Sequence, residues 1–486
     1  MTTNDNNGYR LVSAVFLRLL GGIYLIAFVS ISLQIDGLSG SQGIMPIAER
    51  LANFAQNSGL ERYFIIPTLF WLNSSDLMLA GTTITGCIAA LLVIFNFWSR
   101  AALIVAFVLY LSLFTACQPF LNFQWDSLLL ETGFLAIFLT PQSRVVIWLF
   151  RWLLFRLRFM SGISKLASGD PPWSGLTALD TYFEVQPLPN PVAWYVHQLP
   201  DWLLRFGTAG TLFVEIFVPF MMFLPRRWRL TAAWITIFWQ VLIILTSNHN
   251  WINFLTIILC LFLFDDRALR RVLPTSLQAS MQTQPAAVAS VVKQSAVGLL
   301  AAVILSVSML KLYELASNQS IPGPVGSALR YTTGYSIVNK YHVFPTMTTH
   351  RIELELLGSV DGINWKPYRF KYKPDLLDKR PQFIIPHQPR LDWQMWFVTL
   401  HPRHLPWFGY FLEALLQNSP SVSALLAHNP FADNPPRYIR VDAWQYNFTN
   451  FEERAASGNW WKRTLLGPFT PLPGIERLEP VEDDEP

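Results

Sequence analysis

The chain has 486 residues, of which 52% are hydrophobic and only 14% are charged, and its formal net charge is +4 at pH 7. With a mean hydropathy of +0.31, it is far more apolar than an ordinary soluble globular protein, which places it in the membrane class. Its Lys and Arg residues lie mostly in short clusters beside apolar runs, where they set membrane topology. The positive charge therefore does not indicate nucleic-acid binding.

Nine apolar runs in residues 1–313 are candidates for crossing a bilayer, which takes about 20 residues of helix, with shorter runs tolerated in a bundle. They are residues 11–33, 76–97, 101–117, 127–142, 145–163, 206–224, 230–247, 251–265 and 295–313. Alternate loops carry the basic residues, including Arg100, Arg144 and the cluster at 226–229, whereas loops 118–126 and 247–250 carry none. By the positive-inside rule, residues 1–313 form an α-helical polytopic bundle with the N-terminus inside and the C-terminus outside.

The run at 145–163 is the weakest of the nine. Its residues Arg151, Arg156 and Arg158 also suit an amphipathic helix lying at the membrane surface. If that helix did not cross, however, every later arginine cluster would fall outside. The charge pattern therefore favours a crossing.

Ionisable residues inside an apolar bundle are candidate functional groups, because burying a charge without a partner is costly. Asp126 and Glu131 begin the fourth run, Lys165 follows the fifth and Glu215 lies in the sixth. With Glu184, His197, His249 and Asn253 they are predicted to gather toward the outer face, where they could line one outward-opening cavity. Structural roles are the alternative: Asp126 can cap a helix, and a Glu–Lys pair can hold helices together.

The sequence indicates no metal site and no cofactor. The eight histidines are scattered and none forms a His-x-x-x-His pair. The three cysteines, Cys87, Cys117 and Cys260, all lie within or beside apolar runs. No disulfide framework or thiol-exchange pair is therefore predicted for the later part of the chain.

After residue 313 the long apolar runs cease, and Pro322-Gly323-Pro324 interrupts the chain. Alternation of apolar and polar residues predicts strands at 351–356, 365–372 and 439–448, with a tight turn at Asp361-Gly362. A helical insert is expected at 408–426. We predict a β-rich soluble domain over residues 314–470, followed by an acidic, proline-rich tail at 471–486 with the composition of a disordered segment.

The segment 382–401 is dense in aromatic, basic and acidic residues. Its candidate client-binding residues are His387, Arg390, Asp392, Trp393 and Trp396. Histidine, arginine and carboxylate together suit acid–base chemistry, but no nucleophile elbow lies nearby. The alternatives are a structural Arg390–Asp392 pair with a tryptophan core, or an aromatic surface that binds an unfolded or apolar client.

Several of these blocks resemble the lipase maturation factor family, in the same order and over nearly the whole chain. The segments that carry the resemblance are 124–131, 165–173, 184–197, 370–374, 386–396, 429–431, 460–461 and 467–469. The resemblance implies a multipass membrane protein needed for folding and assembly of secreted lipases, with client binding mainly through the C-terminal domain and no established catalytic residue. It implies either the endoplasmic reticulum membrane with that domain in the lumen, or a bacterial inner membrane with it in the periplasm.

The membrane half is also distantly similar to vitamin K-dependent carboxylases, in which a lysine in a comparable setting acts as a base. The similar position here is Lys165-Leu166 with Trp173. One departure concerns residues 181–183, Thr-Tyr-Phe, which stand where an aromatic-His-aromatic run is expected before Glu-x-Gln-Pro. An activity that needs that histidine is therefore in doubt.

The sequence predicts a membrane-anchored maturation factor or chaperone whose partners are the lipid bilayer and a secreted client protein such as a lipase. The alternative is a membrane-embedded enzyme that acts on a lipid-soluble or exported substrate through Lys165, Glu131 and Glu215.

Overall fold

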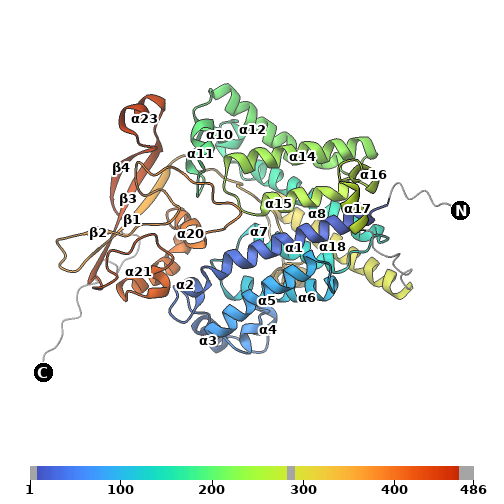
Figure 1. Cartoon of the computed structure of the whole chain (residues 1–486), viewed down its shortest axis with the longest axis horizontal. Helices are drawn as coiled ribbons and strands as arrows, with labels where there is room; N and C mark the ends of the chain where they lie inside the picture. The colour runs from blue at the N-terminus through green and yellow to red at the C-terminus, as the bar shows by residue number, and fades with distance from the viewer. Residues whose placement is uncertain (1–7, 282–290, 470–486) are drawn as a thin grey trace.

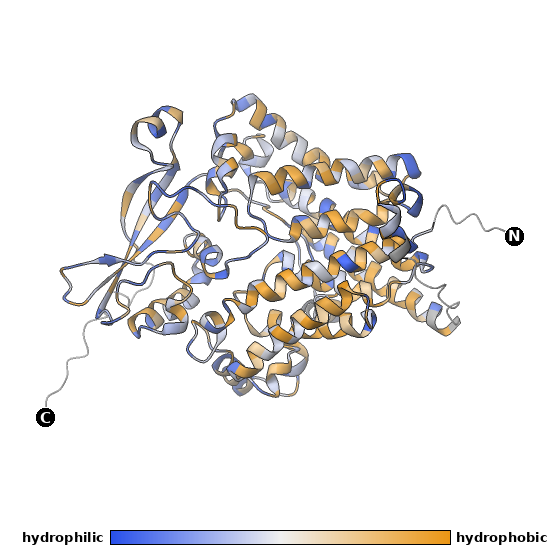
Figure 2. Cartoon of the chain, in the orientation of Figure 1, coloured by the Kyte–Doolittle hydropathy of each residue, from blue (hydrophilic) through white to orange (hydrophobic). Residues whose placement is uncertain are grey.

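The computed structural model describes residues 8–281 and 291–469 (Figure 1). Long helices fill one end of the molecule and a small sheet with short helices forms the other. Apolar residues predominate on the long helices, whereas polar residues are more frequent around the sheet (Figure 2). The predicted tail at 471–486 lies outside the described residues.

Each of the nine predicted apolar runs forms a helix, which confirms the helical bundle. Among the described residues, six helices are long and apolar enough to cross a membrane. These are α1 (Arg10–Ser32), α5 (Asp76–Ile94), α6 (Ser99–Ala116), α12 (Asp201–Ile216) continued by α13 (Val218–Met221), α14 (Arg226–Thr246) and α18 (Val291–Ser317).

The other three predicted spans differ from these six in length or charge. Helix α7 (Gln124–Ile137) has 14 residues, and α15 (Ile252–Leu259) continues only as the short 3₁₀ helix η3 (Cys260–Leu263). Helix α8 (Arg144–Ala167) is long enough, but it carries several basic residues that pair inside the protein. It packs against α12, α18 and η3, so its charges face protein rather than lipid.

Short helices connect the long ones. At the end of the bundle away from the N-terminus, called the outer end below, α1 leads to α5 through α2 (Ile35–Ser39), α3 (Ile47–Asn57), α4 (Arg62–Ile65) and η2 (Leu69–Trp71). Helix α8 leads to α12 through α9 (Pro171–Ser174), α10 (Ala178–Val185) and α11 (Pro191–His197). Helices α16 (Asp266–Leu269) and α17 (Thr275–Ser280) lie at the end where the N-terminus is, and α19 (Gly323–Gly334) follows α18.

Small residues allow α1 and α5 to pack closely. A Cβ atom on Gly86 of α5 would lie 2.3 Å from the Phe28 ring of α1, and one on Gly21 would lie 3.0 Å from the Ala90 carbonyl oxygen. Close backbone approach of this kind is how helices associate in lipid, where hydrophobic burial gives little drive. Glycine at these two positions thus sets the α1–α5 contact.

The sheet has four antiparallel strands in the order β2-β1-β3-β4. They are β1 (Arg351–Ser359), β2 (Lys366–Pro367), β3 (Tyr438–Phe448) and β4 (Trp461–Pro468). The predicted strands at 351–356 and 439–448 are confirmed, and Gly362 has the positive φ of +72° that the predicted turn needs.

The predicted strand at 365–372 is wrong beyond Pro367, and β4 was not predicted. The Tyr368 N–H still donates to the Leu356 carbonyl of β1 at 2.9 Å, but the Arg369 N–H donates to the His428 carbonyl at 3.0 Å, and the N–H groups of Tyr372 and Lys373 donate to the Asp392 carboxylate at 2.7 and 2.9 Å. Partners outside the sheet, first His428 and then Asp392, therefore take the N–H groups that the predicted strand would have offered to β1.

Five short helices accompany the sheet: α20 (Arg390–Val398), η4 (Pro402–His404), α21 (Leu405–Leu416), α22 (Pro420–Ser423) and α23 (Phe451–Ser457). Together they form what is called the outer domain below, because it lies at the end of the molecule away from the N-terminus. The predicted helical insert corresponds to α21 and α22, whereas α20 was not predicted. Apolar residues of β1, β3 and α21 belong to the same hydrophobic cluster as the membrane helices. The two ends of the molecule therefore share one continuous core.

Candidate functional site

A fully buried ion pair joins the first turn of α7 to the first residue of α20. The Arg390 guanidinium donates to both Asp126 oxygens, at 2.7 and 2.8 Å, and the Tyr110 hydroxyl of α6 donates to the same carboxylate at 2.6 Å. The Arg390 backbone N–H donates to Gln34 Oε1 at 2.8 Å. A bidentate arginine–carboxylate pair fixes both distance and orientation. This Asp126–Arg390 pair thus locks the outer domain onto α6, α7 and Gln34, the residue between α1 and α2.

Glu131, further along α7, binds the segment that leads into the sheet. Its Oε2 atom accepts hydrogen bonds from the backbone and side-chain amides of Asn339, both at 3.0 Å, and from the Tyr341 hydroxyl at 2.7 Å. Its other oxygen pairs with Arg156 of α8. All these side chains are buried. Residues 339–341 are therefore held inside the helical bundle by a carboxylate whose oxygens are both occupied.

Glu215 of α12 is shared by two cations of α8. Its oxygens lie 2.8 Å from Lys165 Nζ and 3.4 Å from Arg158 Nη2. The Lys165 ammonium also donates to the Val343 carbonyl at 2.7 Å and lies 5.0 Å from the centre of the Trp173 ring. Lys165 is therefore already paired, and it contacts the same connecting segment that Glu131 holds.

The predicted single cavity is wrong, because Asp126, Glu131 and Lys165 belong to three separate clusters, with Glu215 in the third. In residues 8–281 and 291–469, no hydrogen bond or ion pair joins one cluster to another. Each carboxylate has its own cation, so none is left as an unpaired base. This arrangement suits structural coupling of two domains.

A second set of contacts ties the loop at 184–187 to the sheet. The Arg351 guanidinium of β1 donates to the carbonyl oxygens of Glu184, Gln186 and Pro187 at 2.5–2.9 Å. The Trp396 indole donates to the Val185 carbonyl at 2.8 Å. Because three of their carbonyl groups bind one buried arginine, residues 184–187 have little conformational freedom. The Glu-x-Gln-Pro segment is therefore a docking element between the two domains.

The predicted client-binding residues lie at this domain interface. Arg390, Asp392 and Trp393 are buried, while His387 and Trp396 are partly buried. The proposed Arg390–Asp392 pair is absent, because Arg390 binds Asp126 and the Asp392 carboxylate accepts backbone N–H groups. Client binding by these five residues stays a prediction, and it requires the interface to open.

Polar residues that the sequence analysis did not single out complete the interface. Asn248 donates to the Gln382 carbonyl at 2.8 Å and accepts from the Ile384 N–H at 3.0 Å. Asn250 donates to Gln388 Oε1 at 2.8 Å. The sequence feature that could have identified them is the Asn-His-Asn run between two predicted spans. Polar side chains at such a place have few possible partners other than the outer domain.

The middle residue of that run predicts a pH dependence. His249 contacts the Tyr182 hydroxyl, and burial lowers its pKa to about 4. Its pKa in the unfolded chain is about 6.5, so the unfolded state takes up the proton first as pH falls; stability is complete above pH 6.5 and is lost toward pH 4. Between pH 7 and 5 the fold should lose about 2 kcal/mol through this residue.

Thermal unfolding of the full chain in nanodiscs at pH 7 and pH 5 measures this loss. His249→Gln should reduce the dependence on pH by this amount and leave the part that comes from His387 and His404, whose pKa values burial also lowers to about 4, whereas His350→Gln, at an exposed position, should leave the dependence unchanged. An equal pH dependence in the chain with His249 and in His249→Gln would contradict the assignment.

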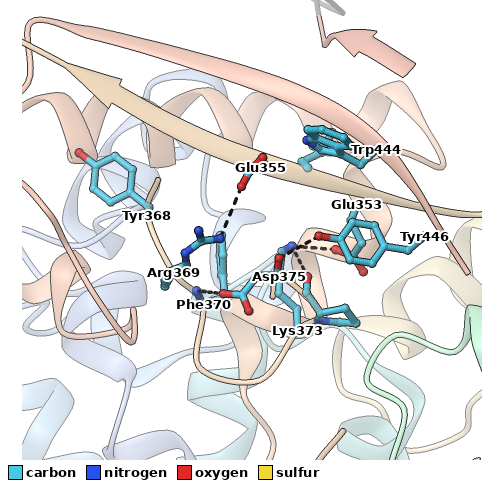
Figure 3. Close-up of a pocket in the computed structure, with 11 residues that line it drawn as sticks. Glu353, Glu355, Tyr368, Arg369, Phe370, Lys373, Asp375, Trp444 and Tyr446 are labelled. Carbon is cyan, nitrogen blue, oxygen red and sulfur yellow. Dashed lines mark hydrogen bonds and ion pairs between the residues drawn. The ribbon is translucent and has the colours of Figure 1, made fainter. Parts of the chain in front are cut away.

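The outer domain also has a shallow hollow on one face of the sheet (Figure 3). Arg369 reaches toward Glu355, Lys373 binds Glu353 at 2.7 Å, and Trp444 and Tyr446 of β3 lie beside them. The space is only about that of one water molecule. These charges therefore pair with each other and leave no room for a small-molecule substrate.

Comparison with known families and proteins covers both ends of the molecule. Residues 11–271 match the family model of the lipase maturation factor transmembrane domain, and residues 337–471 match that of the lipase maturation factor C-terminal domain. The chain belongs to the lipase maturation factor family. In this member, Glu131 lies in the first matched region and Asn339 in the second, so the contact between them joins the two family domains.

Individual family members are similar over most of their length. Lipase maturation factor 2 of Xenopus laevis is 34% identical over 582 residues, covering 95% of this chain and 82% of the relative. Lipase maturation factor 1 of Homo sapiens is 34% identical over 525 residues, covering 98% and 90%. No solved structure matches.

Proposed function

We propose that this chain is a membrane-anchored maturation factor that assists the folding or assembly of a secreted client, and that the client is a lipase. The observation that carries the proposal is the similarity to lipase maturation factors 1 and 2 over nearly the whole chain. The bundle would anchor the protein in a bacterial inner membrane or the endoplasmic reticulum membrane. The outer domain would then face the periplasm or the lumen.

The arrangement of the two domains supports this role. The Asp126–Arg390 pair, the Glu131 contacts and the Arg351 contacts fix the outer domain at the end of the bundle opposite to the N-terminus (Figure 1). A fixed domain beside the membrane meets a client at a constant height and orientation as the client emerges. Because the domain is already ordered, binding of the client costs little conformational entropy of the domain's surface, and this strengthens the encounter.

The specific activity of a secreted lipase tests the proposed function. The lipase is expressed in cells of the source organism with this chain and without it, and activity is divided by the amount of lipase protein. Loss of the chain should lower activity per lipase molecule while lipase synthesis is unchanged. Equal specific activity with and without the chain would contradict the proposal.

Replacement of Lys165 separates maturation from the enzyme alternative. Lys165→Arg keeps a cation beside Glu215, but a guanidinium does not give up its proton and cannot replace a lysine base. We expect lipase specific activity per folded molecule of Lys165→Arg to equal that of the unaltered chain. The amount of folded protein, measured by size-exclusion chromatography in detergent, serves as the control.

A loss of most function in Lys165→Arg at normal levels of folded protein would favour chemistry at Lys165. Lys165→Met guards against a failure of the longer arginine to fit, because it removes the charge without adding volume. It should lower the amount of folded protein but preserve function per folded molecule.

A further inference from the structure

Large apolar side chains are exposed on one short segment at the outer end of the bundle. In α4 and its flanking residues, Leu60 is 78% exposed, Phe64 58% and Leu72 83%. The full set, called the α4 patch, comprises Leu60, Tyr63, Phe64, Ile65, Leu72 and Leu77. A contiguous exposed apolar surface of this kind marks an interaction site.

Hydrogen bonds show how deep the α4 patch lies. Just after α4, the Thr68 hydroxyl donates to the Ser112 carbonyl at 3.1 Å, and the Leu69 N–H donates to the Ser112 hydroxyl at 3.1 Å. Ser112 precedes the outer end of α6 at Ala116 by one helical turn, or about 6 Å. The segment after α4 therefore lies beside the outermost turn of α6.

The α4 patch precedes in sequence an exposed apolar side of α5. Leu77, Ile84 and Ile88 of α5 are exposed, and their spacing places them along one side of the helix. Leu77 belongs both to this row and to the patch. The α4 patch therefore leads in sequence, through the exposed polar residues Asn73, Ser75 and Asp76, to an exposed apolar side of α5.

Arg62, in the first turn of α4, is a charged residue among these apolar side chains, and its guanidinium needs a polar partner. Its guanidinium lies 4.9 Å from the Tyr63 ring centre and 5.5 Å from that of Trp71, and it donates to the Tyr63 hydroxyl at 3.0 Å. Among the residues that the structure describes, no carboxylate pairs with its guanidinium. Arginine beside aromatic rings is typical of the layer of lipid headgroups.

We propose that the α4 patch is an anchor seated in the outer leaflet of the bilayer, with its apolar side chains among the acyl chains and Arg62 on a lipid phosphate. Lipid is the occupant because the segment after α4 is bonded to the outermost turn of α6 and leads directly into α5, both of which are long and apolar enough to cross a membrane. This anchor goes beyond the maturation role and does not depend on it. It holds the outer ends of α1 and α5 at a set depth.

Spin labelling of the full-length chain in phosphatidylcholine nanodiscs tests the anchor. Cys87→Ser removes the one partly exposed cysteine, since Cys117 and Cys260 are buried. A nitroxide is then placed at Phe64→Cys or Leu72→Cys, with Ala456→Cys on exposed α23 as the control. Collision with oxygen, which concentrates in lipid, is compared with collision with a water-soluble nickel chelate.

We expect the ratio of oxygen to nickel collision to be several-fold higher at 64 and 72 than at 456. Ratios equal to that at 456 would overturn the anchor, as would spin–spin broadening that shows a second copy on the patch. Protection from both reagents only after client is added would also overturn it. Two label positions are used so that one misfolded variant does not decide the result.

A charge reversal tests the phosphate contact. Arg62→Glu places a negative charge against lipid phosphate and should lower the oxygen-to-nickel ratio at position 64 toward that of position 456. Glu61→Gln, at the neighbouring exposed residue, is the matched control and should leave the ratio unchanged. An unchanged ratio in Arg62→Glu would overturn the phosphate contact.

Discussion

Asp126→Asn is expected to lower the free energy of unfolding by about 3–5 kcal/mol, because it leaves the Arg390 guanidinium buried without its counter-charge. Both side chains are fully buried, and the remaining partners of Arg390 are the Phe120 carbonyl and nearby aromatic rings. The loss should appear as a lower midpoint of thermal unfolding in nanodiscs. It should also speed proteolytic cleavage within the outer domain.

Asp201→Asn is the matched control, since Asp201 also lies in the first turn of a helix but is exposed. It loses only the favourable interaction with the helix dipole, about 0.3–1 kcal/mol. In the double variant Asp126→Asn/Arg390→Gln neither charge is stranded, so the total loss should be smaller than the sum of the single losses. Equal effects of Asp126→Asn and Asp201→Asn would show that the ion pair does not hold the domains together.

Glu131→Gln is the second substitution with a large expected effect, about 3–5 kcal/mol of destabilisation, because Arg156 would then be buried without a carboxylate. The Asn339 and Tyr341 groups that donate to Glu131 would lose a charged acceptor as well. Release of this segment should expose it to protease. The amount of cleavage near residue 339 and the unfolding midpoint measure the two effects.

The exposed Glu49 provides the control for Glu131, and Glu49→Gln should change stability by no more than about 0.5 kcal/mol. Combining Glu131→Gln with Arg156→Met removes both charges and should recover part of the lost stability. If Glu131→Gln left stability unchanged but abolished lipase maturation, Glu131 would act in chemistry and its structural role would be refuted.

The features that local sequence controls were predictable. Apolar runs identified the nine main helices of the bundle but not the short helices that connect them, and alternation identified β1 and β3, because hydrophobic period follows directly from helix and strand geometry. Asp126, Glu131 and Lys165 were also recognised as unusual, since an ionisable group in an apolar run needs a partner.

The partners were not predictable, because they come from remote parts of the chain. Arg390 is 264 positions from Asp126, and Asn339 is 208 from Glu131. For the same reason the sequence offered nearby Asp392 as the partner of Arg390. Helix α20 was not predicted, because its contacts are with α7 and residues 184–187, which are remote in the sequence. The sequence therefore identified the acidic residues of the site, but not the residues that bind them.

Photo-crosslinking in cells measures most directly whether the outer domain, fixed on the membrane bundle, meets the client. A photoreactive amino acid is placed at Leu465 on the edge strand β4, which is exposed and lies at the far end from the N-terminus, and at Arg227 at the opposite end as the control. We predict an adduct between position 465 and newly made lipase that disappears as the lipase becomes active, and no adduct at 227. An adduct at 227 alone, or none from outer positions while lipase activity still depends on the chain, would contradict a client-binding outer domain.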